Sequence, residues 1–290
     1  MTTTATMTTA GTDRARGAAV GPGPTSSVHA ELTFAGVVRG EWIKLLSLRS
    51  TWWTLAITVA LMALIALAAS ASVADIVADG PAGAPLPHGA ELVTTGTQLG
   101  IVTVAVLGAL LMTGEYSTGM VRSTFAAVPS RLPVLAAKGI VLTAVTVAVT
   151  IISIAASYLV ARPFLDDHGL VPALDDSQTW QVFGGTMYFF VVTALVALGI
   201  ATVLRHTAGA ITAVLGLLLV LPGVLQFITI DWVQDVTSML PLPASFAFLG
   251  VSGAMGGNEV LTAWEGVAVV GAYAVVGLVA GAVLLRRRDA

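Results

Sequence analysis

The stretch 180–204, WQVFGGTMYFFVVTALVALGIATVL, contains no charged residue. As a helix rising about 1.5 Å per residue, it is long enough to cross a hydrocarbon core of about 30 Å. Five more apolar stretches of similar length occupy 52–73, 92–113, 133–160, 208–230 and 264–285. These runs are continuous rather than alternating, which excludes an outer-membrane β-barrel. The sequence therefore predicts an all-α membrane protein with six transmembrane helices.

The composition supports a lipid environment. Of the 290 residues, 56% are apolar and only 10% are charged, whereas soluble domains have about 25% charged residues. Such a chain cannot cover its surface for water, so the bilayer must serve as its solvent. The chain has no cysteine, which excludes disulfides, thiolate metal sites and cysteine nucleophiles.

The distribution of charge predicts the orientation. If both termini are cytoplasmic, twelve of the 13 basic residues lie inside: Arg14, Arg16, Arg39, Lys44, Arg49, Arg122, Arg131, Lys138, Arg205, Arg286, Arg287 and Arg288. Only Arg162 is then outside, together with most of the acidic residues. Cytoplasmic loops of membrane proteins are enriched in Lys and Arg. We therefore expect a multi-pass protein of a bacterial cell membrane with both ends in the cytoplasm.

Two segments precede the first span. Residues 1–30 are rich in Thr, Ala, Gly and Pro and predict a disordered cytoplasmic tail. Residues 31–50 predict an amphipathic helix lying on the membrane, with a solvated helix as the alternative. Its apolar face comprises Phe34, Val38, Trp42 and Leu45, with Lys44 on the other side. Glu41 interrupts that apolar face and makes it imperfect.

Two irregular features lie toward the C-terminus, on the predicted outer side of the membrane. The connection before the last span includes the stretch 238–249, which is too apolar for a free loop and too short and proline-rich to span. It predicts a re-entrant or interfacial helix pair. In the fifth span, Pro222 and Gly223 predict a kink, either a hinge or a static bend. Leu221 and Leu225, one turn apart, either form an outer gate with a partner copy or face lipid.

The sequence contains no motif that indicates a catalytic, metal-binding or nucleotide-binding site. No ionisable residue occupies the central part of a span, which disfavours proton- or ion-coupled transport and an intramembrane metalloprotease. No phosphate-binding G-x-x-x-x-G-K-[ST] motif is present. We therefore expect no catalytic, metal or cofactor site on this chain, no nucleic-acid partner, and an energy source, if one exists, on another polypeptide.

The most informative segment is 114–133, GEYSTGMVRSTFAAVPSRLP, between the second and third spans. The part from Tyr116 to Val128 is long enough for about three helical turns, and Pro129 and Pro133 end it. It is either a docking helix on the cytoplasmic side or a plain connecting loop. Glu115, where the second span leaves the membrane, is placed to pair with Lys44 or Arg49.

The segment 114–124 resembles the one that follows the second span in ABC-2 type transporter permeases. Glu41-Trp42-Ile43-Lys44-Leu45 resembles the amphipathic start of that family, and the layout of 31–290 matches, with a six-span domain over 51–290. The tail 1–30 falls outside the resemblance.

The resemblance implies the membrane subunit of an ATP-driven exporter. Two permeases, identical or paralogous, would pair in the bilayer and bind two separate ATP-binding subunits, which carry ATP and Mg²⁺. Glu115, Tyr116 and Arg122 would then lie in or beside the family's ATPase-coupling helix, and the uncharged spans favour a lipophilic or amphiphilic cargo. The alternatives are an energy-independent channel or secondary carrier, or an integral membrane protein without a transport function.

Overall fold

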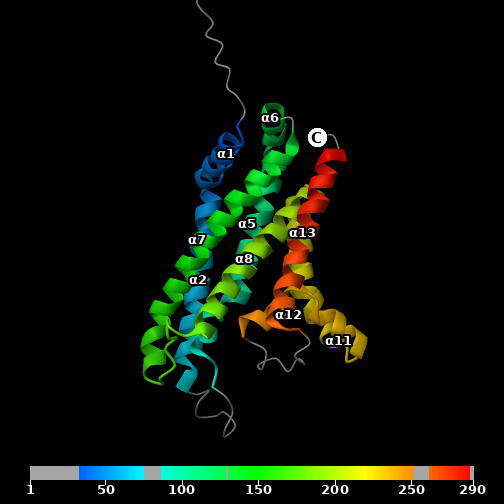
Figure 1. Ribbon diagram of the computed structural model, residues 1–290. Helices are drawn as coiled ribbons and strands as arrows, with labels where there is room; N and C mark the ends of the chain where they lie inside the picture. The colour runs from blue at the N-terminus through cyan, green and yellow to red at the C-terminus, as the bar shows by residue number, and fades with distance from the viewer. Residues whose placement is uncertain (1–32, 75–85, 129, 251–260, 288–290) are drawn as a thin grey trace, which may run out of the picture. The chain divides into compact units, whose positions relative to one another are not determined.

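The computed structural model describes residues 33–74, 86–128, 130–250 and 261–287. These residues fold into helices with no strand among them (Figure 1). Six helical segments are long and apolar enough to cross a membrane, which confirms the predicted number of spans. They are α2 (Arg49–Ala71), α4 with α5 (Gly89–Thr94 and Thr97–Thr118), α7 (Arg131–Asp166), α8 (Ser177–Leu204), α9 with η1 and α10 (Thr207–Leu215, Gly216–Val220 and Leu221–Leu225) and α13 (Ala263–Arg287).

Within the described residues, four shorter helices lie at the ends of these spans. At one end α1 (Phe34–Ser47) and α6 (Met120–Ala127) lie with the C-terminal end of α13 (Figure 1). At the other end α12 (Pro241–Leu249) occupies most of the apolar stretch 238–249, and the more polar α11 (Asp231–Ser238) precedes it (Figure 1). Prolines at the first and third positions of α12 suit a helix start, where the missing N–H groups need no partner. The tail 1–30 lies outside the described residues.

Helix α8 forms the centre of the bundle, packing against α5, α7 and α13. Its closest approach to α13 depends on two glycines. A Cβ built on Gly199 would lie 2.4 Å from the carbonyl carbon of Gly277, so Gly199 does not tolerate a larger residue without separating the helices, whereas a Cβ on Gly277 would make ordinary contacts. Small residues at a helix crossing allow such contact in lipid, where packing rather than water drives association.

The fifth span departs from a regular α-helix just before its proline. Residues Gly216–Val220 form a π-helix, in which the N–H of Leu221 donates to the carbonyl of Gly216, five residues earlier. The irregularity predicted at Pro222 is therefore a wide helical turn on the N-terminal side of this proline. In a regular α-helix the proline ring would clash with the carbonyl of Leu218, and the wide turn relieves this clash. The span ends at Leu225, five residues before the predicted end.

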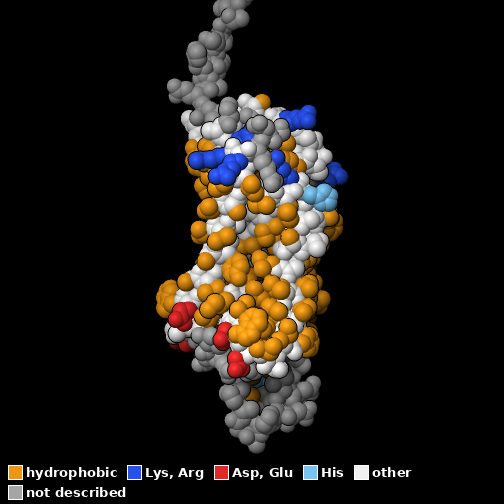
Figure 2. All heavy atoms as spheres, turned by 90° about the vertical axis from the view of Figure 1, so that its right-hand side faces the viewer, with side chains coloured by type: hydrophobic (Ala, Val, Ile, Leu, Met, Phe, Trp, Pro, Cys, Tyr) orange, Lys and Arg blue, Asp and Glu red, His pale blue; other side chains and the backbone are white. Residues whose placement is uncertain are grey.

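Basic and acidic side chains gather at opposite ends of the helical bundle. On the face shown in Figure 2, Lys and Arg gather at one end, Asp and Glu gather at the other, and apolar side chains cover the band between them. Many large apolar residues of the spans are exposed, including Leu64, Ile152 and Val276. Such a band fits a hydrocarbon environment.

Candidate functional site

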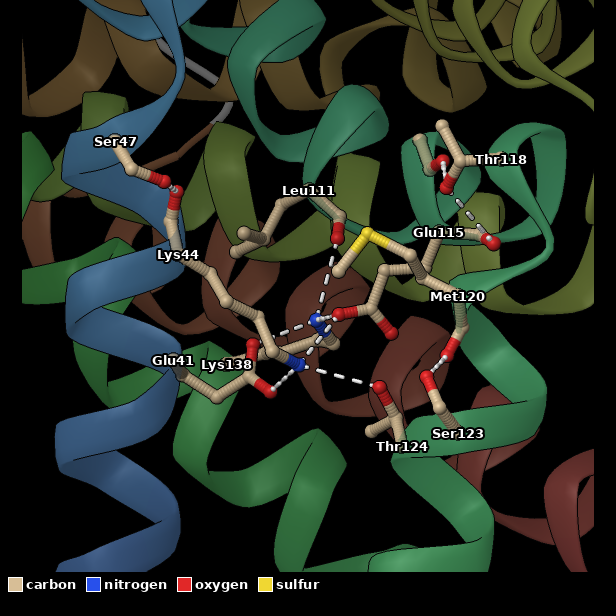
Figure 3. A network of polar contacts seen from close by, with 11 residues as sticks. Glu41, Lys44, Ser47, Leu111, Glu115, Thr118, Met120, Ser123, Thr124 and Lys138 are labelled. Carbon is tan, nitrogen blue, oxygen red and sulfur yellow. Dashed lines mark hydrogen bonds and ion pairs between the residues drawn. The ribbon is translucent and has the colours of Figure 1, made fainter.

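Four charged side chains meet at the end of the bundle that holds α1 and α6. Glu41 and Lys44 come from α1, Glu115 from the last turn of α5, and Lys138 from the second turn of α7. Figure 3 shows the four side chains pointing toward one another. We call this group the charge cluster; it connects α1 with α5 and α7, which are far from α1 in the sequence.

The two lysines bridge the two glutamates at short distances. Lys138 Nζ donates to Glu41 Oε2 at 2.7 Å and to Glu115 Oε1 at 2.7 Å. Lys44 Nζ donates to Glu41 Oε1 at 2.7 Å and to Glu115 Oε1 at 2.9 Å. The expected pairing of Glu115 with Lys44 is thus present, and Lys138 is a second partner that the sequence did not reveal.

The cluster is buried apart from Lys44. The relative exposure is 1% for Lys138, 2% for Glu41 and 7% for Glu115. Removing a charge from water costs several kcal/mol, and only good pairing geometry offsets this cost. The two positive and two negative charges balance, so the cluster is stable as a unit but sensitive to the loss of any one member.

Lys44 is the one member at the surface. Burial lowers its pKa, but hydrogen bonds to Glu41 and Glu115 outweigh this effect and hold the pKa above its ordinary value. Its third proton goes to Thr124 Oγ1 at 3.2 Å. One ammonium group therefore contacts α1, α5 and α6 together, which ties the short helix α6 to the spans.

The inward face of α1 corrects the predicted apolar face. Glu41 and Leu45 are buried and Val38 is half-buried, whereas Phe34 and Trp42 are exposed. Glu41 does not interrupt the face but lies in its middle, because Lys138 provides the partner that lets a carboxylate be buried there. The exposed aromatic rings remain available to contact lipid.

The segment between α5 and α7 also differs from the prediction. Gly119 adopts a left-handed conformation with φ of 74°, which ends α5 at Thr118 and starts α6 at Met120. The helix predicted from Tyr116 to Val128 is therefore two helices, and Tyr116 belongs to the span. Glu115 and Arg122 do not share one face of a continuous helix, and Arg122 is exposed on α6.

The remaining predicted residues lie outside the cluster. Tyr116 packs against Arg205, whose guanidinium carbon lies 5.3 Å from the centre of the tyrosine ring, a cation–π distance. Arg205 ends α8 in a left-handed conformation with φ of 58°. Leu221 and Leu225 lie on α10, which contacts α11 at the opposite end of the bundle.

A cavity of about 290 Å³ adjoins the charge cluster. Its polar edge includes all four members of the cluster, and its apolar wall comes from α1, from α5 and from the residue between α1 and α2: Leu45, Leu48, Leu107, Leu110 and Leu111. Hydroxyl side chains also line it, namely Ser47, Ser50, Thr51, Thr54, Ser117 and Thr118. A cavity that combines ionic groups with an apolar wall can hold a small amphiphilic molecule.

Two signals in the sequence could have led to the full cluster. Glu41 occurs within an apolar face and Lys138 occurs within an apolar run, and an ionisable residue in such a place usually has a partner. Their pairing across the fold remains invisible without the arrangement of α1 against α7. Across the described ranges from 33 to 287, no group of three His, Asp or Glu side chains is placed to hold a metal ion.

Comparison with known proteins identified no similar family or sequence. The chain matches no protein-family model and no curated protein sequence. The functional conclusion therefore rests on the helices and the charge cluster themselves.

Proposed function

We propose that this chain is the membrane subunit of an ATP-driven ABC-2 type exporter, in which the charge cluster transmits movement from an ATP-binding partner to the spans. The observation that carries the proposal is the position of Lys44, whose ammonium contacts Glu41, Glu115 and Thr124 on three different helices. The short helix α6 is exposed at the end of the bundle where the basic residues gather, and a docking helix needs such a place.

The proposed mechanism is a rigid-body coupling. Two ATP-binding subunits, which carry ATP and Mg²⁺, dock below two permease copies and contact α6. When they close on ATP they displace α6, and the contact of Thr124 with Lys44 passes the displacement to α1 and to the end of α5. The buried pairs of Lys138 make these elements move together, because separating them would leave charges unpaired.

The proposed orientation in the membrane rests on the charges at the two ends of the bundle. With the basic end inside, both termini, α1 and α6 are cytoplasmic and the chain lies in a bacterial cell membrane. In that orientation α1 lies at the inner membrane surface, with its exposed Phe34 and Trp42 in the lipid interface, and α11 and α12 lie at the outer surface. The cargo is a lipophilic or amphiphilic compound, since the spans offer no charged pathway at mid-membrane.

The proposal is tested by co-expression with an ATPase carrying a phosphate-binding loop and encoded next to this chain. The Arg122→Glu variant should reduce co-purification of the ATPase about two- to fivefold, because an exposed ion pair contributes up to about 1 kcal/mol. Arg162→Glu reverses an exposed arginine at the other end and serves as the matched control. If no such ATPase associates with the chain, or if both variants behave alike, the proposal is wrong.

A further inference from the structure

The hydrogen bonds of the charge cluster leave one atom unused. Each lysine ammonium has three protons. Those of Lys44 go to Glu41, Glu115 and Thr124. Those of Lys138 go to Glu41, Glu115 and the carbonyl of Leu111, the last at 3.4 Å. The cluster has therefore no donor left to give.

The unused atom is an acceptor. Both oxygens of Glu41 are occupied, and so is Oε1 of Glu115, but Glu115 Oε2 is buried without a hydrogen-bond partner among the described residues. A buried polar atom normally has a hydrogen-bond partner. Without that bond, the protein bears the full free-energy cost of removing the group from water. Glu115 is also one of the residues that line the cavity next to the cluster, so its carboxylate needs only to turn toward that space for a molecule there to supply the missing donor.

We infer that the cavity binds an amphiphile whose head is a protonated primary amine. The head donates to Glu115 Oε2, and the apolar body packs against Leu107, Leu110 and Leu111. An anionic head is disfavoured, because each lysine proton would first have to leave a carboxylate, hydroxyl or carbonyl partner. The cavity volume of about 290 Å³ limits the enclosed part to a small group or the upper part of a chain.

Two sources supply this chemistry: a bilayer lipid with an ethanolamine head and a soluble amine with an alkyl chain. The inference does not depend on the proposed transport function, because binding is measured without an ATPase. A failure of binding would leave the coupling proposal standing, and a failure of ATPase association would leave the binding site standing.

The test uses the full chain in phosphatidylcholine nanodiscs, since that lipid has no N–H donor. Titration calorimetry, with empty nanodiscs as blank, compares octylamine, octyltrimethylammonium and octanoate. We expect saturable binding of one octylamine per chain, at least tenfold weaker binding of octyltrimethylammonium, which has the charge but no donor, and no binding of octanoate. Equal binding of the two cations, or stronger binding of octanoate, would overturn the inference.

A glycine in the cavity wall provides the matched variants. A Cβ on Gly114 meets no atom within 4 Å, so Gly114→Leu places a side chain in the cavity without a clash at the backbone. Gly184, on α8 and away from the cavity, has the same open space, so Gly184→Leu is the control. Octylamine binding should be lost in the first variant and stay within twofold of the unmodified chain in the second. Unchanged binding in Gly114→Leu would show that the amine binds elsewhere.

A further variant and a lipid analysis complete the test. Glu115→Gln keeps the shape of the side chain but replaces one oxygen with an amide donor, so octylamine binding should fall at least tenfold. The ligand series on the unmodified chain decides the matter if a variant fails to fold. Mass spectrometry of lipids that co-purify from native membranes identifies the source: phosphatidylethanolamine enriched over Gly114→Leu indicates the bilayer lipid, and no enrichment indicates a soluble amine.

Discussion

Lys138 Nζ lies 2.7 Å from Glu41 Oε2, and the two residues are 97 positions apart in the sequence. Both side chains are almost completely buried, so this contact fixes α1 against α7. The pair is tolerated in the interior because the attraction between the two charges and their hydrogen bonds offset the cost of removing each charge from water. Its strength is therefore best measured by removing one partner and then both.

Lys138→Met should destabilise the protein by about 3–5 kcal/mol, because Glu41 and Glu115 would keep buried charge with less compensation. The double variant Glu41→Met with Lys138→Met should recover much of this loss, since Lys44 and Glu115 remain paired. Thermal unfolding in detergent, followed by circular dichroism, measures both. A single variant as stable as the unmodified chain would show that the buried pair does not stabilise the fold.

The topology prediction uses the absence of cysteine, which leaves no background for thiol labelling. Ser130 and Asp167 are both exposed, at opposite ends of α7. In whole cells an impermeant maleimide should label Asp167→Cys, and it should label Ser130→Cys only after the cells are permeabilised. The reverse pattern would invert the proposed orientation.

The gate prediction concerns Leu221 and Leu225, at the end of the fifth span that the proposed orientation places outside. They are one helical turn apart and partly exposed, so in the proposed exporter two copies of this chain would bring them together as an apolar constriction. Disulfide crosslinking between copies through Leu221→Cys or Leu225→Cys should change between ATP-bound and nucleotide-free complexes. Val276→Cys, exposed on α13, is the control. Crosslinking that is identical in all states would mean that the two leucines only face lipid.

The pH prediction concerns the start of α8. Asp176 accepts hydrogen bonds from the backbone N–H groups of Gln178 and Thr179, both at 3.2 Å, and the first of these is the main reason why its pKa is below the ordinary value of 3.8. Because the folded pKa is lowered, this stabilisation is present above pH 3.8 and is lost as the pH falls through the lower folded value.

Hydrogen exchange of the first turn of α8 checks this dependence. Protection should decrease on acidification below about pH 3.8 in the unmodified chain. Asp176→Ser should keep a cap that does not titrate, whereas Asp176→Ala should lose protection at every pH. A pH response that persists in Asp176→Ser would assign the effect to another group.

The spans followed from the sequence because hydrocarbon requires long apolar helices with internally satisfied backbones. The end of the fourth span at Leu204 was predicted, but several starts were not, because polar residues such as Ser177 and Arg131 begin α8 and α7 ahead of the apolar run. The π-helix at Gly216–Val220 was not predicted either. One extra residue in a turn changes no hydropathy pattern, and only the nearby proline hinted at an irregularity.

The cluster was half predictable for a related reason. Glu115 and Lys44 both lie near the predicted membrane surface, so local proximity suggested their contact. Lys138 was grouped with the basic residues that set orientation, and Glu41 was treated as a flaw in an apolar face. Recognising that the two form a pair requires knowing that α1 packs against α7, which is a long-range property of the fold.

The sequence separation of the cluster members also affects biosynthesis. The ribosome makes Glu41 and Lys44 first, and these can pair with each other at once because they are one helical turn apart. Glu115 comes later, and Lys138 follows it only with the third span. Until that helix enters the bilayer, Glu41 has no buried partner, so α1 must wait at the membrane surface. The helix α1 can therefore pack in its final position only after the third span has been synthesised.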